Sequence, residues 1–355
     1  MSQDKILTVL DWLGEKEGLG ESWQEQTRNV LTQHEPDSPW YVRLMIAFSA
    51  WITMILMIAF LILAQIVTSS ATALVFGIII LPIAVTIHKK EDSNEFMTQM
   101  SLVLSMTGQG LIWFGMLESV GTGASSIVII LISVGLIYLY KDPLHRFLST
   151  LIMVTAAVIA ISRMPQPELY SVLTIFCAFA IVALQHFKYY FMNAKQMGIY
   201  TPVFYGLIVS LLLLILPNST HYLFFFRLHI EPGITTTGIG LAFLYLQYQL
   251  LSSHKIAGLN PLTALFVCTT VLLIFATQAA PGILAALLII SIGFSRSQKS
   301  IEGLGMVFLI WYLSSWYYNM SSSLLEKSAS LCIAGMLLLG VAFLLHRINS
   351  MEHNA

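Results

Sequence analysis

The chain has 355 residues, of which 57% are hydrophobic and only 10% are charged. Soluble domains contain about 45–50% apolar and about 25% charged residues, so this composition excludes an ordinary soluble protein and predicts an integral membrane protein. The 17 basic and 18 acidic residues nearly cancel. This balance argues against nucleic-acid binding, because contacts to a phosphate backbone need a basic face.

The N-terminal segment, residues 1–39, is the most polar part of the chain, with eight acidic and three basic residues. Apolar residues at helical spacing predict one short helix, and Ser22 with Glu25 forms a capping box that begins a second. Pro36 and Pro39 end the second helix. We expect a cytosolic amphipathic helical hairpin on the bundle or membrane surface, with a docking module for a partner as the alternative.

Residues 40–355 alternate apolar runs with short polar breaks and form the predicted transmembrane domain. A membrane-spanning helix needs about 20 residues, so this length accommodates about 12 spans. The expected fold class is an all-α polytopic membrane protein built from six sequential helical hairpins. The tenth span has the length of a core helix rather than of a full crossing. The predicted spans are 41–67, 71–88, 97–117, 124–140, 147–162, 169–187, 200–216, 234–252, 261–280, 282–295, 303–320 and 328–346.

The placement of basic residues tests this count independently of hydropathy. On a twelve-span path, fourteen of the 17 basic residues fall on one side of the membrane, and only Arg163, Arg227 and Lys327 fall on the other. The positive-inside rule assigns the basic side to the cytoplasm, so we expect both termini to be cytoplasmic. The fourteen are Lys5, Lys16, Arg28, Arg43, Lys89, Lys90, Lys141, Arg146, Lys188, Lys195, Lys255, Arg296, Lys299 and Arg347.

Sequence signals for catalysis are missing. No Asp or Glu lies in the middle of a predicted span, and the motifs of metalloproteases, serine hydrolases and phosphate-binding loops are absent. Cys177, Cys268 and Cys332 lie in apolar runs without CxxC spacing, which predicts buried, unreactive thiols. We therefore expect no cofactor, no metal site and no catalytic residues.

Five histidines fall at the predicted cytoplasmic ends of spans, and no two of them have the i,i+4 spacing of a metal site. We expect them to be interfacial polar caps. They are His88, His145, His186, His254 and His346.

The polar residues of the third predicted span are neutral. Gln99, Thr107 and Gln109 are interleaved with Gly108 and Gly110. Glycines allow helices to approach closely, and amide side chains can bond across helices or line a path. These residues are a candidate intramembrane polar path, and the alternative is that they only hold helices together.

The predicted outer face has few charges, and most of them come as neighbours of opposite sign. A functional interpretation is a polar vestibule that binds a ligand or a partner; the alternative is a set of independent, solvated loop charges. The candidate outer-face site consists of Glu118, Arg163, Glu168, Arg227, Glu231, Tyr317, Tyr318, Glu326 and Lys327.

Two stretches carry a resemblance to a known family. Residues 39–61 read PWYVRLMIAFSAWITMILMIAFL, and residues 293–331 include the tyrosine pair and a later LLEKS. Together they resemble the bacterial membrane family called domain of unknown function 4401. The matching positions are Trp40, Tyr41, Val42, Arg43, Trp51, Tyr317, Tyr318, Leu324, Leu325, Lys327 and Ser328.

The resemblance implies no established activity. It implies a location in the inner membrane of Gram-negative bacteria, and a second small membrane protein with a periplasmic tail as a partner. We expect a non-enzymatic component that binds a partner or a lipid-linked ligand at its outer face, with transport kept open. The alternative is a membrane enzyme for lipid or envelope-polymer substrates that uses Glu118, Glu168, Glu231 or Glu326 as acid or base.

Overall fold

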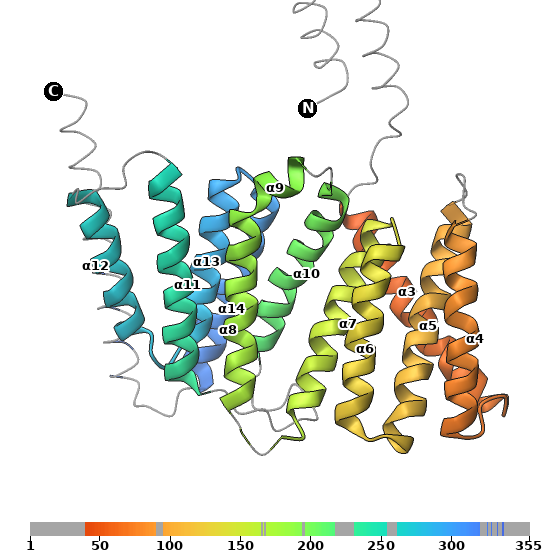
Figure 1. Ribbon diagram of the computed structural model, residues 1–355. Helices are drawn as coiled ribbons and strands as arrows, with labels where there is room; N and C mark the ends of the chain where they lie inside the picture. The colour runs from red at the N-terminus through yellow and green to blue at the C-terminus, as the bar shows by residue number, and fades with distance from the viewer. Residues whose placement is uncertain are drawn as a thin grey trace, which may run out of the picture. The chain divides into compact units, whose positions relative to one another are not determined.

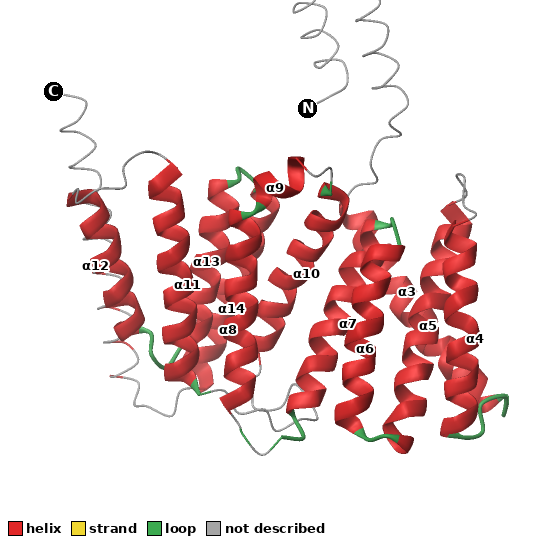
Figure 2. Ribbon diagram, viewed as in Figure 1, coloured by secondary structure: helices red, strands yellow, loops and turns green. Residues whose placement is uncertain are grey.

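The computed structural model describes residues 40–89, 95–164, 166, 168–193, 196–216, 231–253 and 261–319, and single positions at 325, 328, 332 and 336. Across these residues the chain is helical and contains no strand (Figure 2). The all-α prediction is therefore confirmed for this part of the chain. The predicted N-terminal hairpin, residues 1–39, lies outside it.

The chain divides into two compact units, Met1–Ala50 and Trp51–Ala355. Of the first unit, the structure describes only the beginning of the first long helix. The helices are α3 (Trp40–Leu63), α4 (Ser70–Lys89), α5 (Glu95–Ser119), α6 (Thr122–Leu139), α7 (Pro143–Ile161), α8 (Glu168–His186), α9 (Lys188–Asn193), α10 (Met197–Ile215), α11 (Pro232–Ser253), α12 (Pro261–Ala276), α13 (Pro281–Ser295) and α14 (Lys299–Asn319).

Eleven of these helices overlap the first eleven predicted spans. Among the described residues, six helices are long and apolar enough to cross a membrane, namely α4, α5 from Met97 to Ser119, α6, α7, α8 and α10. The shorter apolar helices are Ile52–Leu63, Phe266–Ala276 and Pro281–Ser295. Several apolar helices of this kind indicate a membrane-embedded protein. The twelfth predicted span lies outside the described residues, apart from three single positions.

One helix was not predicted. The segment Lys188–Asn193 forms the short helix α9, where the sequence favoured a loop between two spans. It contacts both α8 and α10 (Figure 1).

Among the described residues, the closest helix pairings of the second unit differ from those of the six predicted hairpins. The most extensive contacts join α4 to α5, α6 to α7, and α13 to α14 (Figure 1). Each of these pairs is connected by one of the basic loops, whereas the prediction paired helices across the basic-poor loops. The described contacts therefore do not confirm the hairpin arrangement.

Glycine explains the close contact between α4 and α5. A Cβ atom added at Gly115 would lie 2.6 Å from both the backbone N of Leu74 and the carbonyl O of Ser70. Since no side chain fits there, the two backbones approach each other directly, as small residues permit in membrane helices.

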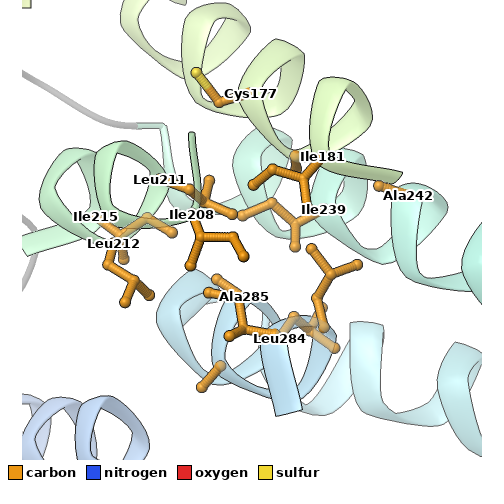
Figure 3. Packing of buried hydrophobic residues seen from close by; sticks show 14 of the residues in the cluster. Cys177, Ile181, Ile208, Leu211, Leu212, Ile215, Ile239, Ala242, Leu284 and Ala285 are labelled. Atoms are coloured by element: carbon orange, nitrogen blue, oxygen red, sulfur yellow. The ribbon is translucent and has the colours of Figure 1, made fainter. Parts of the chain in front are cut away.

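The largest apolar core lies between α8, α10, α11 and α13 (Figure 3). Cys177 and Ile181 reach it from α8, and Ile239 and Ala242 reach it from α11. The central contribution comes from α10, whose buried side chains Ile208, Leu211, Leu212 and Ile215 meet Leu284 and Ala285 of α13. This core combines aliphatic side chains with buried aromatic ones such as Tyr200, Phe204 and Tyr312.

Candidate functional site

A group of buried polar side chains lies between α5, α6 and α7. We call Ser105, Gln109, Ser133, His145 and Ser149 the polar seam; each is at most 2% exposed. Ser105 and Gln109 are four positions apart on α5, so they lie on one face of that helix. His145 and Ser149 share a face of α7 for the same reason. Three helices therefore turn their polar faces toward a common interface.

His145 is the centre of the polar seam. Its Nε2 lies 2.8 Å from Ser105 Oγ on α5, and its Nδ1 lies 3.2 Å from Ser149 Oγ on α7. In the neutral imidazole one ring nitrogen donates and the other accepts, while each hydroxyl can do either. Both nitrogens of a fully buried ring are thus satisfied by groups that can reverse their hydrogen-bonding roles.

Gln109 extends the polar seam toward α6. Its Nε2 donates to the carbonyl O of Ser105 at 3.4 Å, and its Oε1 accepts from Ser133 Oγ at 3.4 Å. Both residues lie near the middle of their helices. Ser126 lies on the same face of α6, about two turns nearer the start of that helix. Its buried Oγ has no hydrogen-bond partner among the described residues.

Local structure fixes the position of His145. Asp142 caps α7 by accepting from the backbone N–H groups of Leu144 and His145, at 3.3 and 2.9 Å. Pro143 occupies the first turn, where its missing N–H removes no bond. The Tyr140 ring stacks on the imidazole with centroids 3.7 Å apart and an interplanar angle of 3°. The cap and the stack together set the ring's depth and orientation.

Tyr140 also connects the polar seam to α4. The His88 ring stacks with Tyr140 at a centroid distance of 4.4 Å, and His88 Nε2 accepts from the backbone N–H of Lys141 at 3.0 Å. The end of α4 is therefore attached to the turn between α6 and α7.

Arg146 follows His145 directly, but its side chain bonds to backbone carbonyl groups rather than to polar-seam residues. It is 7% exposed, its Nε donates to the carbonyl O of Ile137 at 2.9 Å, and its Nη1 donates to the carbonyl O of Gly198 at 2.6 Å. A cation at the C-terminal end of α6 is favoured by the helix dipole. Arg146 thus links the end of α6 to the first turn of α10.

The structure does not bring the predicted intramembrane polar path together. Gln99 is exposed, whereas Thr107 and Gln109 are buried. Thr107 and Gln109 are two positions apart, which places them about 200° apart around the helix. Only Gln109 belongs to the polar seam, and Thr107 Oγ1 has no hydrogen-bond partner in the described part of the chain.

None of the described candidate outer-face residues belongs to the polar seam. Glu118, Arg163 and Glu168 are exposed, and Arg163 and Glu168 form no ion pair with each other. Glu231 is half-buried, and its backbone N–H donates to Ser171 Oγ at 3.1 Å. The outer-face site stays a prediction, because Arg227, Glu326 and Lys327 lie outside the described residues.

The tyrosine pair of that candidate site is described. The rings of Tyr317 and Tyr318 meet edge to face with centroids 5.8 Å apart, and Tyr318 is 81% exposed. The pair presents an aromatic surface near the end of α14.

Two sequence-based expectations need correction. His145 is not an interfacial cap but is fully buried, because Ser105 and Ser149 satisfy both of its ring nitrogens. Burial of the thiols is confirmed for Cys177 but wrong for Cys268 and Cys332, which are exposed. An apolar run fixes that a residue lies on a membrane helix, but not which face it occupies.

The sequence did contain a signal for the polar seam. Ser101, Ser105 and Gln109 recur at four-residue intervals in α5, as do His145 and Ser149 in α7. Polar residues at this spacing form one stripe on an otherwise apolar helix. Two such stripes in neighbouring spans indicate a shared polar interface.

Comparison with known proteins gives one match. The family model described as Domain of unknown function (DUF4401) matches residues 39–348. No curated protein and no solved structure matches the chain. Within the described residues, no group of three or more His, Cys, Asp or Glu side chains is arranged to hold a metal ion.

Proposed function

Since the chain belongs to the family described as Domain of unknown function (DUF4401), whose description names no activity, we propose a function from its geometry. The chain is a multi-pass membrane protein that conducts protons along the polar seam of α5, α6 and α7. It acts without a catalytic site or a cofactor.

The observation that carries this proposal is the double hydrogen bonding of His145. A neutral imidazole between two hydroxyls accepts a proton on one nitrogen and releases one from the other. Burial disfavours the imidazolium, so the charged form is a short-lived intermediate rather than a resting state.

The remaining seam residues support a longer path. Gln109 and Ser133 place further polar groups near the middle of α5 and α6, where the Gln109 amide donates to the backbone carbonyl of Ser105 and accepts from Ser133 Oγ. Ser126 offers a further buried hydroxyl on the same face of α6. The path runs from the His145 end through Gln109 and Ser133 toward Ser126.

The test is proton flux into liposomes that contain the purified full chain and a trapped pH-sensitive dye, driven by a potassium gradient with valinomycin. We expect the chain to acidify the interior several-fold faster than empty liposomes do. His145→Phe keeps a ring to stack on Tyr140 but removes both nitrogens, so flux falls to the level of empty liposomes.

His186→Phe is the matched control. It makes the same substitution at an exposed histidine at the end of α8, and we expect unchanged flux. Wild-type flux equal to that of empty liposomes contradicts the proposal. Flux through His145→Phe equal to that of wild type does so as well.

The proposed topology has twelve spans in the bacterial inner membrane, with both termini in the cytoplasm. Its support is the concentration of fourteen of the 17 basic residues on one side of that path. A periplasmic reporter fused after Glu118 or after Glu231 should be active. Cytoplasmic behaviour of either fusion contradicts the topology.

A second proposal concerns binding at the outer face. The exposed Glu118, Arg163 and Glu168 and the exposed Tyr318 offer charged and aromatic surface. They suit a lipid-linked ligand or a small membrane protein with a periplasmic tail. A pull-down of the tagged chain in mild detergent, with mass spectrometry of proteins and lipids, should recover such a molecule. Recovery of no specific molecule counts against this proposal.

The enzyme alternative has less support. Cleavage of a glycosidic bond in an envelope polymer typically uses two carboxyl groups placed on either side of that bond. In the described part of the chain, no hydrogen bond or ion pair involves the carboxylates of Glu118, Glu168 and Glu231.

A further inference from the structure

We propose that Arg296 binds the phosphate of an anionic phospholipid headgroup, at the end of the helices where α9 lies. The proposal concerns a different group of residues from the polar seam. It does not depend on proton conduction.

Arg296 follows the last residue of α13 and is held by uncharged groups on two other helices. Its Nε donates to Gln185 Oε1 on α8, and its Nη2 donates to the hydroxyl of Tyr200 on α10. The guanidinium carbon lies 3.8 Å from the ring centroid of Phe204 and 5.3 Å from that of Tyr200. These contacts orient the guanidinium firmly but supply no negative charge.

The positive charge of Arg296 is not neutralised by any described carboxylate. The ion pair described nearest in sequence joins Lys299 to Glu302 at 3.4 Å and leaves Arg296 out. Burial lowers the pKa of Arg296 to about 10, so the group stays charged at neutral pH. A partly buried cation without an anion is unfavourable, and a bound anion removes that cost.

The guanidinium also has hydrogen-bonding capacity left. Of its N–H donors, only two have hydrogen-bond partners among the described residues. The others form the planar fork that matches a phosphate group. An oriented cation with free donors is therefore suited to a phosphate ligand.

Helix α9 indicates that this phosphate belongs to a lipid. Phe187, Tyr189, Tyr190 and Met192 are all more than 50% exposed along α9 and the turn before it. Exposed aromatic side chains of this kind are typical of the membrane–water interface. Phe191 of the same helix lies 5.4 Å from the Tyr200 ring. Arg296 is thus connected, through Tyr200, to a helix suited to the headgroup region.

The experiment measures the affinity of the detergent-solubilised full chain for three probes by isothermal titration calorimetry. They are a short-chain phosphatidylglycerol, the corresponding zwitterionic phosphatidylcholine, and inorganic phosphate. We expect phosphatidylglycerol to bind most tightly. Equal affinity for the two lipids overturns the proposal. Phosphate binding as tightly as phosphatidylglycerol identifies a site for free phosphate and overturns the lipid assignment.

Variants then locate the site. Arg296→Gln removes charge-assisted hydrogen bonds, so its Kd for phosphatidylglycerol rises about tenfold or more. Lys299→Gln makes the same charge change three residues away at an exposed, paired side chain, and its Kd should change by less than about twofold.

A further variant tests the same site if Arg296→Gln does not fold. Tyr200→Phe keeps the ring beside the guanidinium and removes the hydroxyl that orients it, so we expect a smaller rise in the same Kd. Unchanged phosphatidylglycerol affinity in Tyr200→Phe and in any folded Arg296→Gln protein overturns the proposal.

Discussion

The second unit contains two helix interfaces built from different chemistry. Between α8, α10, α11 and α13, apolar side chains such as Leu211, Leu284 and Phe204 fill most of the space (Figure 3). Between α5, α6 and α7, the equivalent space holds Ser105, His145 and other hydrogen-bonding groups. Both interfaces belong to helices of similar apolar composition, so overall hydropathy does not distinguish them.

This difference in chemistry indicates what each interface contributes to the protein. An apolar interface is specified by the volumes and shapes of its side chains, and its contribution is mainly stability. A buried polar interface is directional, and in membrane helices its hydrogen bonds contribute only about 0.6 kcal/mol each on average. Stability alone therefore gives little reason to place five polar groups between α5, α6 and α7. The comparison predicts that core variants lose mainly stability, whereas seam variants lose more function than their smaller loss of stability explains.

The largest stability effect is expected in the apolar core. Leu211→Ala removes a fully buried side chain of α10 and leaves a cavity, so the free energy of unfolding should fall by about 2–5 kcal/mol. Leu213→Ala makes the same change at a side chain that is 44% exposed on the same helix, and its effect should be small. Unfolding in mixed detergent micelles measures both. Equal losses contradict the assignment of this core.

The α4–α5 contact should respond almost as strongly to added volume. Gly115→Ala places a methyl group against the backbone of Leu74 and Ser70, which should cost about 1–3 kcal/mol of unfolding free energy. Gly135→Ala on α6 meets nothing within 4 Å and should be neutral or gain up to about 1 kcal/mol through helix propensity. Thermal unfolding of the two variants side by side gives the comparison.

Within the polar seam, Gln109→Leu separates stability from function. It leaves Ser133 Oγ without its acceptor, so we expect a loss of about 1–3 kcal/mol in unfolding free energy. Proton flux per folded molecule, which already corrects for the unfolded fraction, should also fall. Gln99→Leu on the same helix changes an exposed residue and should alter neither quantity. Full flux in folded Gln109→Leu would show that the amide only holds helices together.

The smallest effect is expected for a single hydroxyl. Ser133→Ala removes one buried hydrogen bond to Gln109 and should cost about 0.5–1.5 kcal/mol. Ser314→Ala removes an exposed hydroxyl that bonds only to its own helix, at Ile310 O, and should stay within about 0.5 kcal/mol of wild type. A double-mutant cycle of Ser133→Ala with Gln109→Leu would isolate their coupling.

Much of the helix framework could be predicted from the sequence, because an apolar run of sufficient length in a membrane leaves few alternatives to a helix. The pairing of the helices could not be predicted. It depends on features such as the missing Cβ of Gly115 against Leu74, which join residues far apart in the chain. Helix α9 was missed because six residues of mixed character resemble a loop.

The sequence indicated only part of the polar seam. Gln109 stood out as an amide in an apolar span, but its neighbour Thr107 stood out equally and lies on another face. The sequence correctly places His145 at a helix end but does not show its burial, since its partner Ser105 is 40 residues away. Arg296 looked like an ordinary loop cation, and only the fold brings Tyr200 and Gln185 to it.

The most direct test of the central claim is proton flux per folded molecule in liposomes, compared between wild type, Leu211→Ala and His145→Phe. We predict that Leu211→Ala retains the flux of wild type at a temperature where it is folded, while His145→Phe falls to the level of empty liposomes. Wild-type flux in His145→Phe, or equal loss in both variants, would contradict the claim that the polar seam conducts protons.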